Sequence, residues 1–275
     1  MITIPEFADR SKLFDWLVAN KSLLIAQKKS TVKHADAFSA GTSYILDDDK
    51  TVIQKADELP ATAKKLKVRS IINTTKIFDS FYDVHIDQLW NKSIKETKDN
   101  FLVKQHDFTF DGIISDNVHV HTKQFEWYDL NYNYPGKTQG LIYDSIIDRD
   151  EMPDATKSMF DHYRKGKVKQ HSVGMRYVEL FMAVNDERYK EEFETWKKYY
   201  DGIANKEDAL HNGYFWAVTI GKNIEGSAVV RGANFATPTL HVEEKKEPAA
   251  SIPIINEPAA SIRLNASQLI KFYKP

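Results

Sequence analysis

The feature that most constrains the fold is a succession of short apolar segments between residues 65 and 231, each of about the length of a β-strand. Several alternate apolar and polar residues, the period of a strand with one face against a core. The segments expected to be strands are 65–74, 101–110, 118–125, 140–147, 169–177, 214–220 and 224–231. A chain with this many short strands and a few helical segments is predicted to be α+β.

The helical segments are identified by apolar residues three or four positions apart. The expected helices are 9–19, 86–94, 154–165 and 186–204. Aromatic residues form one stripe along the last of these, and we interpret that stripe as a face that covers the core. The segment Gly221-Lys-Asn is predicted to be a hairpin turn that pairs the strand before it with the strand after it.

Composition limits the chemistry that is available to the chain. Lysine and arginine number 38 against 39 aspartates and glutamates, so no global field favours nucleic acid or an anionic membrane. The absence of cysteine excludes disulfides, thiolate zinc sites and a cysteine nucleophile. No signal-peptide pattern or membrane-length apolar run is present. We therefore expect a cytoplasmic protein that binds neither nucleic acid nor membrane.

The segment Lys169–Tyr177 carries the candidate nucleophile, Ser172. Alternation along a strand puts Ser172 and Gly174 on one face and His171 on the other, so His171 is a poor candidate for its base. A serine hydroxyl is a weak nucleophile unless a base within hydrogen-bond reach takes its proton. We take His106 as that base, mainly because of the resemblance that follows.

Four separated segments carry a recognisable pattern in a fixed order. They are Phe78–His85 with D-S-x-x-D-V, Phe101–Asp107 ending in His-Asp, the Ser172 strand with S-V-G-M, and Glu225–Asn234 with E-x-S-x-V-x-x-x-A-N. Together they resemble the tailed-phage prohead (capsid maturation) proteases, relatives of the herpesvirus assemblins. The resemblance spans about residues 65 to 240. One departure is Gly232, where the family usually has proline.

The resemblance implies the architecture and the domain limits. We expect a mostly antiparallel, β-barrel-like core wrapped by helices, of the assemblin and prohead-protease kind, in residues 65–240. Residues 1–64 are then an N-terminal extension and residues 241–275 a flexible tail. The tail contains Glu-Pro-Ala-Ala-Ser-Ile twice, and we hypothesise that the enzyme removes part of this tail from itself.

The resemblance also implies the chemistry. Ser172 is the expected nucleophile, His106 on a neighbouring strand the base, and Glu225 the residue that holds the imidazole. Arg231, expected on the strand face of Glu225, can add positive charge near the oxyanion. The expected function is a serine endopeptidase, without metal or cofactor, that cleaves phage scaffold and major capsid proteins. It would act in the host cytoplasm within the assembling prohead, where it can also form a homo-oligomer.

Three alternatives stay open. The N-terminal region and the tail motivate a second hypothesis, a non-catalytic, protease-like scaffold protein. A histidine-metal hydrolase could use His106, His119 and His121, since two histidines on one strand face can share a metal if a third ligand is present. His119, His121 and His211 are also alternatives to Glu225 in the third position, where the herpesvirus relatives use a histidine.

Overall fold

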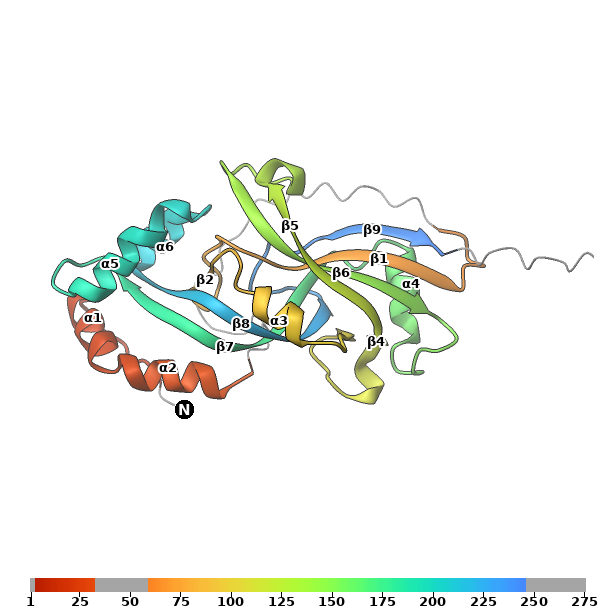
Figure 1. Cartoon of the computed structure of the whole chain (residues 1–275), viewed down its shortest axis with the longest axis horizontal. Helices are drawn as coiled ribbons and strands as arrows, with labels where there is room; N and C mark the ends of the chain where they lie inside the picture. Colours follow the sequence, from red (N-terminus) through yellow and green to blue (C-terminus); the bar gives the residue numbers. More distant parts are fainter. Residues whose placement is uncertain (1–2, 33–58, 246–275) are drawn as a thin grey trace, which may run out of the picture. The chain divides into compact units, whose positions relative to one another are not determined.

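The computed structural model describes residues 3–32 and 59–245, which form two β-sheets flanked by helices (Figure 1). The first sheet has the order β5-β6-β1-β9, and each pair in it is antiparallel. Its strands are β1 (Lys65–Thr74), β5 (Asn117–Glu126), β6 (Lys137–Asp148) and β9 (Thr239–Glu244). The strand order is open, so the described residues form no closed barrel, and the expected barrel-like core is replaced by two sheets.

The second sheet is built around one long strand, β8 (Tyr214–Val229). On one side β8 pairs antiparallel with β7 (Gln170–Val184). On its other side it pairs parallel with two short strands, β2 (Asp83–His85) and β3 (Leu102–Lys104), and β3 continues to β4 (Ile113–Ser115). The α+β class expected from the sequence is confirmed, and the sheet is mixed because β2 and β3 run parallel to β8.

The core joins the two sheets through one cluster of buried apolar side chains. Strands of both sheets contribute to it, among them Leu66 and Val68 of β1, Tyr143 of β6, and Val173 and Met175 of β7. Burying a side chain of this size contributes about 1.5–3 kcal/mol. The two sheets therefore stabilise each other, and the backbone of β7 and β8 is held from the core side.

Helices cover the edges of this core. The helical elements are α3 (Asn91–Glu96), α4 (Lys157–Arg164), α5 (Lys190–Tyr199) and α6 (Lys206–Asn212), with 3-10 turns η1 (Phe110–Gly112), η2 (Trp127–Leu130) and η3 (Tyr200–Gly202). Trp196 of α5 is buried and stacks on Tyr200, as expected for an aromatic face that covers the core. None of the described helices is long and apolar enough to cross a membrane.

The predicted hairpin at Gly221 is wrong, because β8 runs without a turn through this position. Gly221 pairs with Tyr177 of β7 inside the sheet. A Cβ atom built on Gly221 would lie 2.9 Å from Met175 and 3.0 Å from Trp90. The glycine is therefore required by close side-chain packing, a tertiary cause that the local Gly-Lys-Asn sequence does not signal.

The C-terminal limit of the predicted domain also needs correction. β9 extends to Glu244, so the first residues assigned to the flexible tail form a strand of the first sheet. Contacts within the chain divide it at Lys245, and the repeated tail segments at 246–275 lie outside the described residues.

The N-terminal helices, α1 (Arg10–Ala19) and α2 (Lys21–Ser30), add buried apolar side chains to the core, and α2 also contacts the second sheet through an ion pair. Nζ of Lys28 lies 2.7 Å from Oδ1 of Asp83, whose side chain is completely buried. The Tyr177 hydroxyl donates to the other oxygen of the same carboxylate. A buried carboxylate is costly unless it is paired and hydrogen-bonded. Through Lys28, α2 supplies a positive charge that stabilises the Asp83 carboxylate of the second sheet.

Lys28→Met should lower the free energy of unfolding by about 2–4 kcal/mol, because it removes the ion pair between Lys28 and the buried Asp83 carboxylate. Urea unfolding measures the change. Lys29→Met is the matched control, since Lys29 is exposed on the same helix, and it should change stability by less than about 0.5 kcal/mol. Equal losses in the two variants would contradict the role given to Lys28.

Candidate active site

Ser172 lies near the start of β7, directly opposite Ser227 of β8. It is 4% exposed, and its hydroxyl makes no hydrogen bond to any other residue in the described part of the chain. After β8 the chain returns past it, and a Cβ atom built on Gly232 would lie 3.6 Å from Cβ of Ser172. The Ser172 side chain is therefore closely flanked by the backbone of the segment that contains Gly232.

The returning segment is tied to the backbone of β7 next to Ser172. The N–H group of His171 donates to the carbonyl of Thr237 at 3.0 Å, and the Thr237 hydroxyl donates to the carbonyl of His171 at 2.5 Å. A Cβ atom on Gly232 would approach the same His171 carbonyl to 2.9 Å. Glycine lets the segment come this close, which accounts for its presence where the resemblance expects proline.

His106 lies in a turn after β3, and the prediction of a strand through residues 101–110 is wrong beyond Lys104. Gln105 and His106 both have left-handed backbone conformations, with φ of 50° and 58°. Residues other than glycine adopt this conformation rarely, and no local sequence pattern signals it here. The turn directs the His106 side chain back over the second sheet, where Glu225 accepts its hydrogen bond.

His106 and Glu225 form a buried hydrogen bond. Nδ1 of His106 lies 2.5 Å from Oε1 of Glu225, and the two side chains are 3% and 0% exposed. A carboxylate can only accept, so Nδ1 carries the proton and the lone pair of a neutral imidazole is on Nε2. This is the tautomer that a general base requires.

Glu225 brings the imidazole close to the strand that carries Ser172. It pairs with Gly174 of β7, and a Cβ atom built on Gly174 would lie only 2.1 Å from Oε1 of Glu225. Ser172 is two residues before Gly174 on the same face of β7, so the two residues are about 7 Å apart along the strand. The carboxylate and the imidazole bound to it therefore lie on the face of β7 that carries the Ser172 hydroxyl.

The sequence led us to expect His106 and Ser172 on neighbouring strands, and this is wrong. β8 lies between β3, which His106 follows, and β7, which carries Ser172. The described residues contain no hydrogen bond between the two side chains. Hydrogen bonds of catalytic groups are often long or absent without substrate and tighten when it binds. The structure brings together His106 with Glu225 and places both beside the Ser172 strand.

A β-bulge lies next to Glu225. Gly174 pairs with Glu225 and Met175 pairs with Asn223, so Ile224 is the extra residue on β8. Bulges bend a strand and redirect the neighbouring side chain. The alternation expected for residues 224–231 starts only after this point, and nothing in the local sequence predicts the bulge.

His171 faces away from Ser172, as strand alternation predicts. Its Nε2 atom lies 2.9 Å from the Tyr163 hydroxyl of α4, and the side chain is completely buried. Burial lowers the pKa of His171 to about 4. His171 is therefore a neutral core residue, bonded to a different element from the one that holds His106.

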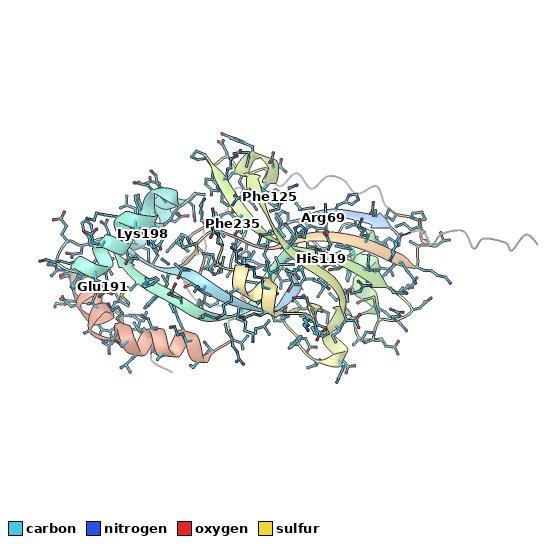
Figure 2. The ribbon with its side chains drawn as sticks, in the orientation of Figure 1. Arg69, His119, Phe125, Glu191, Lys198 and Phe235 are labelled. Atoms are coloured by element: carbon cyan, nitrogen blue, oxygen red, sulfur yellow. The ribbon has the colours of Figure 1, made fainter. Side chains whose placement is uncertain are left out.

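The other candidate residues lie elsewhere. Arg231 is exposed and follows the end of β8 at Val229, so the expectation that it shares a strand face with Glu225 is wrong. His119, labelled in Figure 2, and His121 both lie on β5 in the first sheet. Their rings stack, and Nε2 of His121 lies 3.2 Å from Oδ2 of Asp144. His211 lies in the last turn of α6, and its carbonyl accepts a hydrogen bond from the Arg10 side chain at 2.6 Å.

The described residues contain one group of potential metal ligands, and it includes neither His119 nor His121. The group is Asp79, Asp83 and His85, whose ligand atoms all lie within 4.8 Å of one another. Sequence reasoning singled out this segment only as a motif. Asp83 already binds Lys28 and Tyr177, and Asp79 accepts from two backbone N–H groups. These contacts give the cluster a structural role without a metal.

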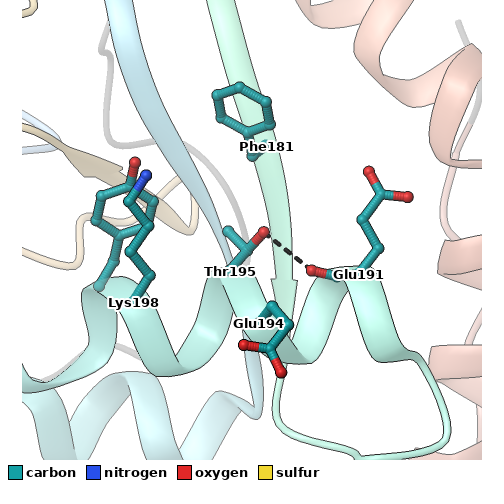
Figure 3. Close-up of a pocket in the computed structure, with 6 residues that line it drawn as sticks. Phe181, Glu191, Glu194, Thr195 and Lys198 are labelled. Carbon is teal, nitrogen blue, oxygen red and sulfur yellow. Dashed lines mark hydrogen bonds between the residues drawn. The ribbon is translucent and has the colours of Figure 1, made fainter.

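A pocket lies between β7 and α5, at a distance from the Ser172 site (Figure 3). Its lining residues are Phe181, Glu191, Glu194, Thr195, Lys198 and Tyr199. Phe181 is nine residues after Ser172, which is roughly 30 Å along a strand. This pocket is therefore not part of the His106 and Glu225 arrangement.

Comparisons with known protein families, curated proteins and solved structures find no match for this chain.

Gly174→Ala should destabilise the protein by about 1–3 kcal/mol, because the new methyl group collides with the Glu225 carboxylate. It should also displace the Nδ1 proton resonance of His106 in NMR spectra. Gly202→Ala is the matched control, since a Cβ atom there meets nothing within 4 Å. An unchanged His106 resonance in Gly174→Ala would contradict the packing of Glu225 on Gly174.

Stability should fall as the pH drops from 6.5 towards 4, in part because of His171. Its folded pKa of about 4 is below the ordinary histidine value of 6.5, so the unfolded chain binds the extra proton first as the pH falls. This contribution amounts to roughly 2 kcal/mol between pH 7 and pH 5. His171→Phe should lack that part of the pH dependence in urea unfolding, and equal pH dependence in both proteins would contradict it.

Proposed function

We propose that this protein is a serine endopeptidase in which Ser172 is the nucleophile, His106 the general base and Glu225 the residue that orients the imidazole. The observation that carries the proposal is the buried hydrogen bond between His106 and Glu225, beside the strand of Ser172. A buried imidazole and carboxylate in contact, with a serine hydroxyl on the adjoining face, is the arrangement that activates a hydroxyl.

In the proposed mechanism the hydroxyl of Ser172 attacks the carbonyl carbon of a peptide bond while Nε2 of His106 takes its proton. The same nitrogen returns the proton to the leaving amine, and an acyl-enzyme remains on Ser172. Water then enters, gives a proton to His106 and releases the second product. Glu225 stays ionised throughout and stabilises the imidazolium that forms in each step.

The oxyanion requires hydrogen-bond donors that are already in place. The segment that passes Ser172 supplies backbone N–H groups, and that of Gly232 donates to Oε1 of Gln170 at 3.3 Å. This bond is long, so a developing negative charge could replace it at small cost. A single oxyanion donor contributes about 3–4 kcal/mol to the stability of a transition state.

The biological role that we propose is cleavage of phage scaffold and major capsid proteins in the assembling prohead, within the host cytoplasm. Its support is the ordered resemblance of four motifs to the prohead proteases and assemblins. In this proposal the two β-sheets together are a variant of the assemblin-like fold. The tail from residue 246 would be a further substrate of the same site.

A second candidate is a protease-like scaffold protein without activity. The absence of a hydrogen bond between Ser172 and His106 in the described structure favours it, as does the low exposure of Ser172. A fluorophosphonate probe separates the two candidates, because it reacts only with a serine whose hydroxyl is activated.

Ser172→Ala should abolish fluorophosphonate labelling and lower cleavage of a co-expressed major capsid precursor by at least about 10³-fold. The fold should persist, because the change removes one oxygen atom. Ser80→Ala, at an exposed serine, is the control and should retain both activities. Intact-mass spectrometry of the same proteins tests whether only active enzyme loses its tail.

Full cleavage by Ser172→Ala would overturn the assignment of the nucleophile. A wild-type protein that neither reacts with the probe nor cleaves the precursor would instead support the scaffold protein.

A further inference from the structure

We infer that Ser227 is a positioning residue whose hydroxyl fixes the backbone turn that aims His106 at the site. This inference rests on the proposed role of His106 as the base. Ser227 belongs to β8, two residues after Glu225, and its side chain is completely buried. Glu225 holds the imidazole ring, and Ser227 holds the backbone from which that ring extends.

The contacts of Ser227 use both functions of its hydroxyl. Its Oγ atom accepts a hydrogen bond from the backbone N–H of His106 at 2.8 Å. The same hydroxyl donates to the carbonyl of Val103 at 3.3 Å. Because its proton points at a backbone carbonyl, Ser227 is not a second nucleophile, and its hydroxyl joins the end of β3 to the turn that follows.

The register of the sheet puts Ser227 between the proposed catalytic residues. Ser227 pairs with Val103 of β3 on one side and with Ser172 of β7 on the other. Alternation places its side chain on the same face as that of Glu225. A shift of the His106 backbone relative to β8 would therefore move the imidazole relative to both Glu225 and Ser172.

The turn itself needs external support. Gln105 and His106 have left-handed conformations in succession, which side chains other than glycine adopt only when their surroundings hold them. The N–H groups of Gln105 and Asp107 bond to backbone carbonyls, which substitution leaves in place. The N–H of His106 bonds to the Ser227 side chain, so substitution at 227 removes this support selectively.

A purely structural role would give a different result from a positioning role. Loss of any buried hydroxyl that bonds to backbone groups lowers stability. Only a positioning role lowers the rate of the chemical step while substrate binding is kept. Ser115 offers a matched comparison, because its hydroxyl accepts from the N–H of Asn117 and donates to the carbonyl of Ile146.

The test compares wild type, Ser227→Ala, Ser115→Ala and Ser172→Ala in one assay of peptide cleavage and fluorophosphonate labelling. Ser227→Ala should lower kcat and the labelling rate about 10- to 100-fold with KM changed less than about 2-fold. Hydrogen exchange at the His106 amide should become at least 10-fold faster in Ser227→Ala. Ser115→Ala should change neither quantity.

If Ser227→Ala does not fold, Ser227→Cys replaces it, since a thiol fills similar space but is a weak acceptor. A kcat equal to that of wild type in the folded variant would overturn the inference, and so would equal losses in Ser227→Ala and Ser115→Ala. If wild type reacts no faster than Ser172→Ala, the proposed peptidase fails. The exchange of the His106 amide then still decides whether Ser227 fixes the turn.

Discussion

The second sheet depends on the accommodation of one carboxylate, that of Glu225, in a place that excludes water. An ionised carboxylate is stable there only with a partner in direct contact, and the imidazole of His106 provides it at 2.5 Å. The space for the carboxylate comes from the missing side chain of Gly174. The bulge at Ile224 gives β8 the local geometry that directs Glu225 into this space.

β8 has a central position because it carries Glu225, which must contact both His106 after β3 and Gly174 of β7. β8 is the only described strand that pairs with both β3 and β7, so each segment that carries a proposed catalytic residue has its position defined against it. Core packing against β1 and β6 holds β8 from the opposite face, where Tyr143 lies against Gly226. The second sheet therefore holds Glu225, Ser172 and the His106 turn in place, and the three side chains lie on one face of that sheet.

Sequence reasoning succeeded where structure follows local pattern. Residues 65–74 form β1 as predicted, and the helix expected after Asp9 is α1. It failed where tertiary packing decides: Gly221 serves side-chain packing in an unbroken strand, and the left-handed conformation of His106 depends on contacts with β8. The motifs singled out His106 and Glu225, and E-x-S-x-V includes Ser227 without indicating a role for it. The role of Ser227 and the bulge exist only when the strands are assembled.

The order of these residues along the chain has a consequence for synthesis. His106 and Glu225 are 119 residues apart in sequence, and the proposed base and nucleophile both precede β8, the strand that organises them. Contacts of such long sequence range form late, after a large loss of chain entropy. A nascent chain that has reached Ser172 thus contains the proposed nucleophile and the proposed base but lacks β8. A ribosome must therefore complete nearly the whole fold before the chain can acquire this arrangement, so the proposed peptidase would be inactive on a growing chain.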